Sequence, residues 1–400
     1  MRRFCFAVIV VLLVVGACSN AATEDATGPS SSEVRPSVTS APSSRASGTT
    51  TAPSSAALPR GDWYLVWVTG WLPEGFAEGL REVSGVDVVS VVWVGNAHVV
   101  ETMTEDGTVV DRAPEGFVIP VELQGIDPVS HAEFVPPQVA ALLAGLADDE
   151  VALGRSSARL RRLGLGATLT LEDGTSVTVA AVIDDEWIGA AELVTTRSDP
   201  VPLGADRARY AILRYEGSRR DLESALAVLT EQPVRVWAEG EIPILRHADP
   251  VRSQIAIKER FGEFAYRPGD DQRFGIDPDW VSANIVTVEL PLLGNVTCHR
   301  DFADLLRQVM ERLDAAGLDG VIDPSAFKGC WNPRFIRGRR DLSRHAWGVA
   351  ADINFGNPLE GPGSPIAPVL LETMEAMGIT SGHDWINPDP GHFEWYGLGA

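Results

Sequence analysis

Two histidines and one aspartate near the C-terminus have the side-chain types of a metal site. His345 and His392 supply imidazole nitrogens, and Asp352 supplies carboxylate oxygens. These donors suit Zn²⁺, and three protein ligands leave the fourth position of a tetrahedral site open for water. Since catalytic zinc sites have this open position and structural ones do not, the trio predicts metal-assisted hydrolysis.

The chain must bring these ligands together from separate segments. His345 and Asp352 are seven residues apart, so in one straight strand their side chains would face opposite sides. Gly348 lies between them and can relax the backbone. We therefore expect the histidine to come from a loop and the aspartate from a strand over 350–354.

His392 has two acidic neighbours. Glu394 follows it by two residues, so the two side chains share one face of an extended segment. Asp389 precedes it by three residues, across Pro390 and Gly391. This spacing predicts that Asp389 reaches a water molecule at the open metal position.

These segments resemble one peptidase family. The string S-R-H-A-W-G-V-A-A-D-I-N (343–354) matches the S-x-H-x-x-G-x-A-x-D signature of the peptidase M15 family, and D-P-G-H-F-E (389–394) matches its closing motif. N-P-R-F-I-R-G (332–338) also fits, and the resemblance covers about residues 260–397. The family contains VanY-type D-alanyl-D-alanine carboxypeptidases and L-alanyl-D-glutamate endopeptidases, which cut peptidoglycan stem peptides.

The resemblance implies a small antiparallel-sheet zinc peptidase domain of the hedgehog/DD-peptidase type. It implies zinc ligation by His345, Asp352 and His392, with Asp389 as the general base. Many relatives carry glutamate at the base position, and the shorter Asp389 serves if its loop lies closer. The resemblance further implies a catalytic arginine, Arg334 or Arg337, that binds a substrate carboxylate or polarises the scissile carbonyl.

Three further residues are candidate substrate contacts. Ser343 belongs to the first motif, and His383 and Trp385 lie just before the second. The expected reaction is hydrolysis of an amide bond in peptidoglycan, either of the D-Ala-D-Ala carboxypeptidase type or of the L-Ala-D-Glu endopeptidase type.

Two alternatives compete with this interpretation. A serine DD-peptidase is suggested by S-A-F-K (325–328) and S-A-N (282–284), but their order is reversed relative to that class and the chain has no K-T-G. The second alternative is a non-catalytic lipoprotein that binds the cell wall or a partner and keeps zinc for structure. The complete ligand set with an acid at 389 favours the peptidase.

Two of the four cysteines flank a helix expected over 301–313. Outside the cytoplasm Cys298 and Cys330 should form a disulfide that closes a loop of about 33 residues and stabilises the fold by roughly 3–4 kcal/mol. Two unpaired buried thiols are the alternative.

The N-terminus predicts export. Residues 1–17 have a basic start and a short apolar run, which is typical of a signal peptide and too short to span a membrane. The sequence V-G-A-C resembles a bacterial lipobox, so Cys18 is the expected lipidation site and membrane anchor; an ordinary secretory signal is the alternative. Residues 18–59 are rich in Ser, Thr, Ala and Pro and predict a disordered tether.

Residues 60–245 predict a separate α+β domain of unknown role. Strands are expected over 63–68 and 86–94, a hairpin across Asp173-Gly174, and a strand–helix–strand succession ending near 237. L-G-L-G-A-T-L-T-L-E-D-G resembles a segment of the extracytoplasmic domains of MacB-type transporter permeases. Residues 60–245 have no recognisable cluster of metal ligands or nucleophiles, which favours a binding or positioning module.

The length and net charge of the chain limit its number of domains and the classes of partner that it can bind. Its 400 residues suggest at least two domains, here two α+β domains including the zinc peptidase domain at 255–400. The formal net charge of −22 gives no general electrostatic attraction for nucleic acid or anionic lipid. Recognition of an anionic cell wall must therefore be local, through arginines and the metal.

Overall fold

The computed structural model describes residues 63–189, 191–197, 202–238, 241, 252–269, 272–339, 341–356 and 367–397. They belong to one compact unit, Ser55–Ala400. The signal peptide, Cys18 and the tether lie outside the described residues. The domain boundaries stay a prediction; residues 63–238 are called the large-sheet region and residues 252–397 the C-terminal region.

The large-sheet region mixes strands with short helices. Its strands are β1 (Trp63–Val68), β2 (Val86–Met103), β3 (Val109–Arg112), β4 (Ile119–Ile126), β5 (Glu150–Gly154), β6 (Thr168–Leu171), β7 (Ser176–Ile183), β8 (Leu193–Thr196), β9 (Arg207–Tyr215) and β10 (Val234–Ala238). Its α-helices are α1 (Phe76–Glu82), α2 (Pro128–His131), α3 (Pro137–Ala144), α4 (Arg155–Arg161) and α5 (Arg219–Leu229). Short 3₁₀ turns occur at Ala132–Phe134, Asp185–Trp187 and Pro202–Gly204.

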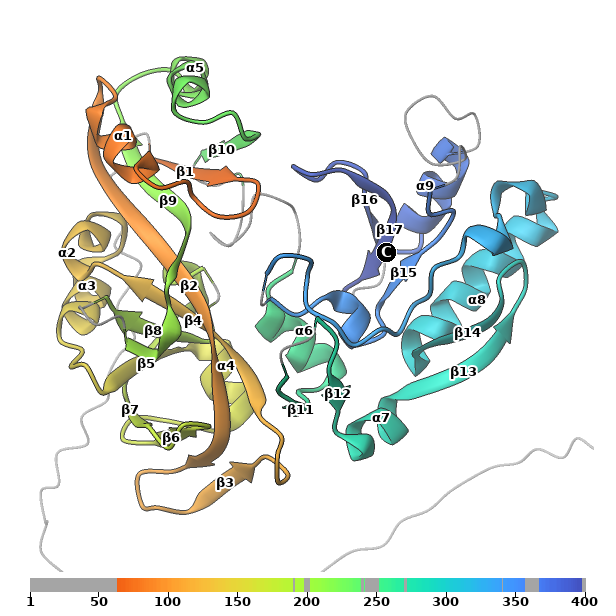
Figure 1. The fold of residues 1–400 in the computed structure, drawn as a ribbon, viewed down its shortest axis with the longest axis horizontal. Helices are drawn as coiled ribbons and strands as arrows, with labels where there is room; N and C mark the ends of the chain where they lie inside the picture. Colours follow the sequence, from red (N-terminus) through yellow and green to blue (C-terminus); the bar gives the residue numbers. More distant parts are fainter. Residues whose placement is uncertain are drawn as a thin grey trace, which may run out of the picture. The chain divides into compact units, whose positions relative to one another are not determined.

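These strands form one sheet in the order β10-β1-β9-β2-β4-β8-β5-β7-β6, with β3 paired to β2 (Figure 1). Strand β6 also pairs with β2, so the strands from β2 round to β6 close into a barrel. Strand β2 continues well past the predicted end at 94, because its second half pairs with both β4 and β6. Pairing with two neighbouring strands thus extends β2 beyond residue 94, where the local sequence did not predict a strand.

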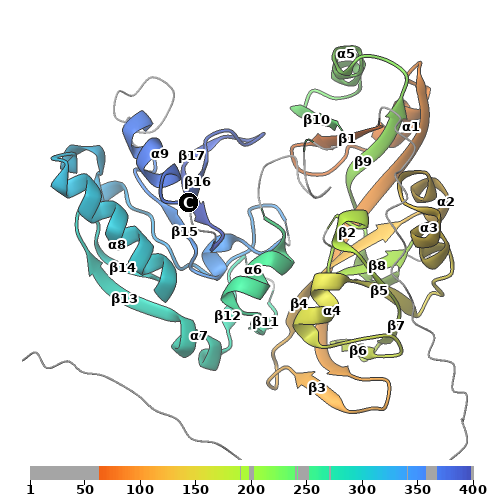
Figure 2. The same ribbon diagram turned by 180° about the vertical axis from the view of Figure 1, so that it is seen from behind.

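Two helices cover one face of the part of the sheet outside the barrel. Phe76 and Leu80 of α1 and Leu222 and Leu226 of α5 are buried against β1, β2 and β9. Figures 1 and 2 show α1 and α5 side by side at this end of the region. The predicted strand over 63–68 and the strand–helix–strand succession are confirmed, as is the hairpin, where Gly174 takes the positive φ that the turn needs.

The C-terminal region has its own set of helices and strands. Its helices are α6 (Gln254–Phe261), α7 (Pro278–Asn284), α8 (Arg300–Ala315) and α9 (Ala367–Glu375). Its strands are β11 (Tyr266–Arg267), β12 (Gly275–Ile276), β13 (Ile285–Leu290), β14 (Gly294–His299), β15 (Ala350–Asp352), β16 (Ile379–Gly382) and β17 (Asp389–Trp395). The 3₁₀ turns are Asp319–Val321, Pro324–Ala326 and Arg344–Ala346.

Helix α8 contributes buried side chains to the core of this region and confirms the helix predicted over 301–313. One face is apolar and buried, and it lies along the β13–β14 hairpin (Figure 1). Strands β15, β17 and β16 form a three-stranded antiparallel sheet. The α+β class predicted from the sequence is therefore confirmed, and the C-terminal region contains the expected small antiparallel sheet.

A disulfide joins Cys298, in β14, to Cys330, in the segment that leads to the first motif. Both cysteines are buried in the core of the C-terminal region. Among the described helices, none combines the length and apolar character that crossing a bilayer demands.

Candidate metal centre

Three potential ligand atoms meet between β15, β17 and the turn at Arg344–Ala346. Nε2 of His345 lies 3.1 Å from Oδ1 of Asp352, and Nδ1 of His392 lies 2.9 Å from the same oxygen. The two ring nitrogens are 3.3 Å apart. Within the described residues, this trio is the group of histidine, cysteine and acidic side chains that could hold a metal ion.

The hydrogen bonds behind the two histidines decide which nitrogen faces the centre. Nδ1 of His345 donates to the backbone carbonyl of Cys330 at 2.7 Å, because a carbonyl can only accept. Nε2 of His392 donates to Oε1 of Glu394 at 2.9 Å. In neutral imidazoles the remaining nitrogens carry lone pairs, so two lone pairs and a carboxylate oxygen point at one place.

This donor set fits Zn²⁺. Zinc–nitrogen and zinc–oxygen bonds of roughly 2.0–2.1 Å in a tetrahedral site put neighbouring ligand atoms about 3.3 Å apart, close to the separations found here. A carboxylate and a backbone carbonyl hold the outward nitrogens of the two imidazoles, as is usual for histidine ligands of zinc. Three protein ligands leave one position open.

Local backbone structure explains how the ligands converge. Asp352 and His392 are directly opposite each other in the antiparallel pair of β15 and β17. His345 lies in a short 3₁₀ turn, and its backbone N–H donates to the hydroxyl of Ser343. Gly348 has a φ of 69°. A side chain there would meet the backbone nitrogen of His299 at 2.6 Å, so the bend between His345 and β15 requires glycine.

The electrostatics of the centre favour a cation. Burial opposes charge on Asp352, but the imidazoles of His345 and His392, when they carry a second proton, outweigh it and hold its pKa far below the usual range. Burial likewise opposes charge on His392, yet its bonds to Asp352 and Glu394 raise its pKa to about 9. The carboxylates therefore create a place where positive charge is stabilised, by a proton or by a metal ion.

Asp389 lies at the start of β17, half-buried beside the centre. Burial raises its pKa, while the charge on His392 opposes the rise. The pairing of β16 with β17 shifts register at Ser381 and Gly382, opposite Asp389. Such a bulge redirects side chains at a strand end, and here it occurs where Asp389 meets the site.

The two predicted arginines differ in their positions. Arg334 is half-buried, and its backbone carbonyl accepts a hydrogen bond of 3.1 Å from the N–H of Ser343, in the first motif. Its positive charge opposes the rise in the pKa of Asp389. Arg337 is exposed in the turn that follows, so Arg334 is the more buried of the two predicted arginines.

The predicted substrate contacts surround the same centre in different ways. Ser343 is buried and caps the turn that carries His345, which is a structural role. The ring of Trp385 lies 5.1 Å from that of His392. His383 pairs with Asp384 at 3.0 Å, at the edge of the site.

The two groups that orient the imidazoles were not predicted from the sequence; they are the carboxylate of Glu394 and the backbone carbonyl of Cys330. For Glu394 a signal was present, because its spacing from His392 predicts that the two side chains share a face and can form a hydrogen bond. The carbonyl of Cys330 had no such signal, because a backbone acceptor has no side-chain identity to read.

The comparisons with known proteins agree with this location. Residues 337–395 match the M15 family model described as D-alanyl-D-alanine carboxypeptidase. No curated protein matches the chain.

Two solved structures have low similarity to the chain. The periplasmic region of MacB from Actinobacillus actinomycetemcomitans is 11% identical, covering 45% of this chain and 89% of that one, with a TM-score of 0.29. The extracellular domain of the noncanonical ABC-type transporter YknZ from Gram-positive bacteria is 16% identical, covering 44% and 99%, with a TM-score of 0.28.

The family match contains all three converging ligands, together with Asp389 and Glu394. Residues 337–395, which hold these side chains, therefore match an M15 peptidase domain within the C-terminal region.

Proposed function

We propose that this protein is a zinc-dependent peptidase that hydrolyses amide bonds in peptidoglycan stem peptides. The observation that carries the proposal is the convergence of two imidazole lone pairs and one carboxylate oxygen within 3.3 Å. Three acceptors without a proton to share repel one another, and a divalent cation relieves that repulsion. An M15 match over the same residues supports peptide chemistry.

Bound zinc would acidify a water molecule and polarise a carbonyl oxygen. His345, Asp352 and His392 would hold the metal, and Glu394 and the Cys330 carbonyl keep the two imidazoles oriented. Asp389 takes the proton from the attacking water and passes it to the leaving amine, and its raised pKa improves it as the donor in the second step.

Arg334 gives the site its substrate preference in this proposal. Its guanidinium would bind a carboxylate or a polarised carbonyl of the substrate. Peptidoglycan stems carry carboxylates, which suit a guanidinium. Because the chain is strongly acidic overall, this local positive charge must supply the attraction.

We also propose an extracytoplasmic location with a lipid anchor at Cys18. The signal-like residues 1–17 and the disulfide between Cys298 and Cys330 support this location, since disulfides persist in oxidising compartments. Peptidoglycan is the proposed macromolecular substrate, and nucleic acid is not an expected partner.

The test is digestion of purified peptidoglycan by the wild type, Asp389→Asn and Asp314→Asn, with released termini identified by mass spectrometry. The matched control for the loss of one carboxylate is Asp314→Asn, because Asp314 is exposed on α8 and takes no part in the site. Free D-alanine identifies a carboxypeptidase, and new C-terminal L-alanine identifies an endopeptidase. Either product should appear when zinc is supplied and vanish when zinc is removed. Asp389→Asn should lose about 10²–10⁴-fold in rate, while Asp314→Asn retains the wild-type rate.

No new termini from zinc-loaded wild type would overturn the proposal and favour a non-catalytic binding protein. Zinc content is measured in parallel. A His345→Ala variant that binds zinc as tightly as the wild type would contradict the assigned ligands.

A further inference from the structure

A short loop borders the metal centre and leads directly into the proposed base. It comprises residues 383–388, between β16 and β17. Its Trp385 lies against the ring of His392 with centroids 5.1 Å apart, and the backbone N–H of Trp385 donates to Gly382 at 3.2 Å. The position of this loop therefore determines one wall of the site.

The loop is held by the large-sheet region. Nη2 of Arg235, on β10, donates to the backbone carbonyl of Asp384 at 3.0 Å. Ile386 packs against the hydrophobic cluster that contains Leu65 and Trp67 of β1. The guanidinium of Arg235 lies 5.8 Å from the ring of Trp237, two residues along the same strand. The large-sheet region, which is distant from the loop in the sequence, thus makes one polar and one apolar contact with it.

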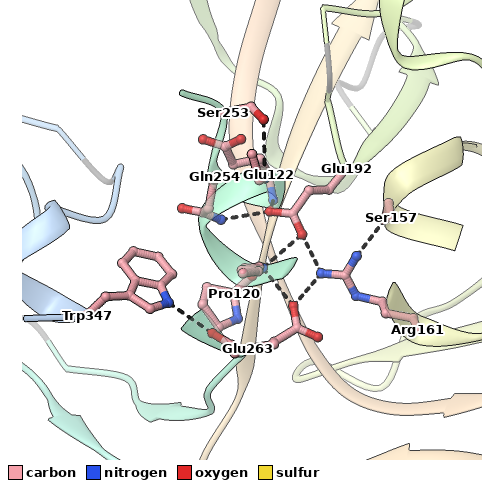
Figure 3. A network of polar contacts seen from close by, with 12 residues as sticks. Pro120, Glu122, Ser157, Arg161, Glu192, Ser253, Gln254, Glu263 and Trp347 are labelled. Atoms are coloured by element: carbon pink, nitrogen blue, oxygen red, sulfur yellow. Dashed lines mark hydrogen bonds and ion pairs between the residues drawn. The ribbon is translucent and has the colours of Figure 1, made fainter. Parts of the chain in front are cut away.

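A buried network of charges attaches the two regions near α6 (Figure 3). Glu192, immediately before β8, accepts from Lys258 and from Gln254 of α6, each at 2.8 Å, and from Arg161 of α4. Glu263 pairs with the same two cations. The side chains of Glu192 and Lys258 are 0% exposed. Two anions balance two cations, and separating the regions would break this balanced set.

A hydrogen bond within the C-terminal region links this charge network to the segment that carries His345. Nε1 of Trp347 donates to the carbonyl of Gly262 at 3.0 Å, and Gly262 precedes Glu263 of the network. Trp347 follows His345 by two residues and is fully buried. Val118 and Tyr266 also exchange two backbone hydrogen bonds of 2.8 Å between the regions. Buried ion pairs and backbone hydrogen bonds thus join the C-terminal region to the large-sheet region near α6.

We propose that Arg235 is a positioning residue for the peptidase site, through which the large-sheet region holds the 383–388 loop and Trp385 in the arrangement that binds substrate. This inference rests on the proposed function. It gives residues 63–238 a defined part in catalysis, because substrate binding depends on a contact made by β10.

The experiment compares full-length wild type with Arg235→Ala, Arg235→Lys and the control Arg220→Ala. Arg220 is exposed on α5 and belongs to none of the contacts with the loop. Five quantities are measured in each protein: hydrogen exchange of the 383–388 amides, zinc affinity, kcat and KM on a stem peptide, and the melting temperature.

Arg235→Ala should raise both loop exchange and KM by about fivefold, the equivalent of losing one net hydrogen bond of roughly 1 kcal/mol. Zinc affinity, kcat and the melting temperature should stay at the wild-type values. Arg235→Lys should recover most of the loss, since an ammonium can still donate to the carbonyl, and Arg220→Ala should match the wild type.

Loop exchange in Arg235→Ala equal to that of the wild type would overturn the inference. So would a rise in KM that occurs equally in Arg220→Ala, or one accompanied by loss of zinc. If zinc-loaded wild type has no peptidase activity, the proposed function fails, and the exchange measurement alone then decides whether Arg235 holds the loop.

Discussion

The Nε2 atom of His392 lies 2.9 Å from the Oε1 atom of Glu394, and both side chains are buried. Because a carboxylate accepts this bond, the imidazole turns its other nitrogen toward Asp352. Burial opposes the charge on Glu394, but the bond to His392 outweighs it and lowers the pKa of the carboxyl group. A buried anion therefore lies directly behind one proposed metal ligand and increases its basicity.

Removing that anion should weaken metal binding. Glu394→Ala is expected to lower zinc affinity by about 10–100-fold, because the imidazole loses its orientation and part of its basicity. Glu394→Gln keeps an acceptor oxygen and should lie between Ala and the wild type. The measurement is competition with a chromophoric chelator. Equal affinity in the wild type and Glu394→Ala would show that the carboxylate has no effect on the metal.

The disulfide between Cys298 and Cys330 should stabilise the fold substantially. Its cysteines are separated by 32 residues, and closing such a loop contributes about 3–4 kcal/mol in the chain-entropy model. Replacing both cysteines by alanine should lower the free energy of unfolding by that amount in urea denaturation. Reductant should destabilise the wild type and leave the double variant unchanged; a wild type insensitive to reductant throughout unfolding would contradict the expectation.

Glu192 should be far more important to stability than a surface acid on the same junction. Glu192→Ala leaves Lys258 and Arg161 buried with one remaining anion, which costs about 3–5 kcal/mol. The control is Glu259→Ala, which removes the pair of Glu259 with Arg159; their side chains are 28% and 64% exposed. Such a pair contributes about 0–1 kcal/mol.

Both variants are compared by urea unfolding and by hydrogen exchange of α6. We expect faster exchange across α6 in Glu192→Ala only. If the two variants lose the same free energy, the network is not an important attachment between the two regions.

The buried side chain of His131 should make the folded state less stable in acid, independently of the metal site. Burial lowers its pKa to about 4, whereas the unfolded chain titrates near 6.5. Between these values the unfolded state binds more protons, so stability is complete above pH 6.5 and falls as the pH drops toward 4. The loss from this group approaches about 3 kcal/mol.

His131→Asn tests this titration. The amide can replace Nδ1 in the contact with Ser90, which is 3.1 Å long, but it does not titrate. The free energy of unfolding is measured by urea denaturation between pH 4 and 7. We expect a shallower dependence in the variant, and parallel curves for the two proteins would exclude His131 as the cause.

Several elements could be predicted from local sequence because local interactions form them. The apolar run at 63–68, the Asp173-Gly174 turn and the helical periodicity over 301–313 each specify their structure within a few residues. The closure of the barrel could not be predicted in this way. It depends on pairing β2 with β6, which are far apart in the chain and have no sequence signal for each other.

Residue identity and spacing were enough to predict which donor side chains converge. The types and spacing of His345, Asp352 and His392 predict a metal-ligand set, and the short distance of Asp389 from His392 along the chain predicts that it lies beside this set. These features follow from side-chain type and short-range geometry.

The arrangement of that chemistry came from the packing of the whole chain. Packing selected the nitrogen that each histidine turns inward, and it placed Arg235 against the loop beside the centre. Each of these depends on a backbone acceptor or on a contact between distant segments. Such contacts form only when the tertiary structure is complete, because no short stretch of sequence contains both partners.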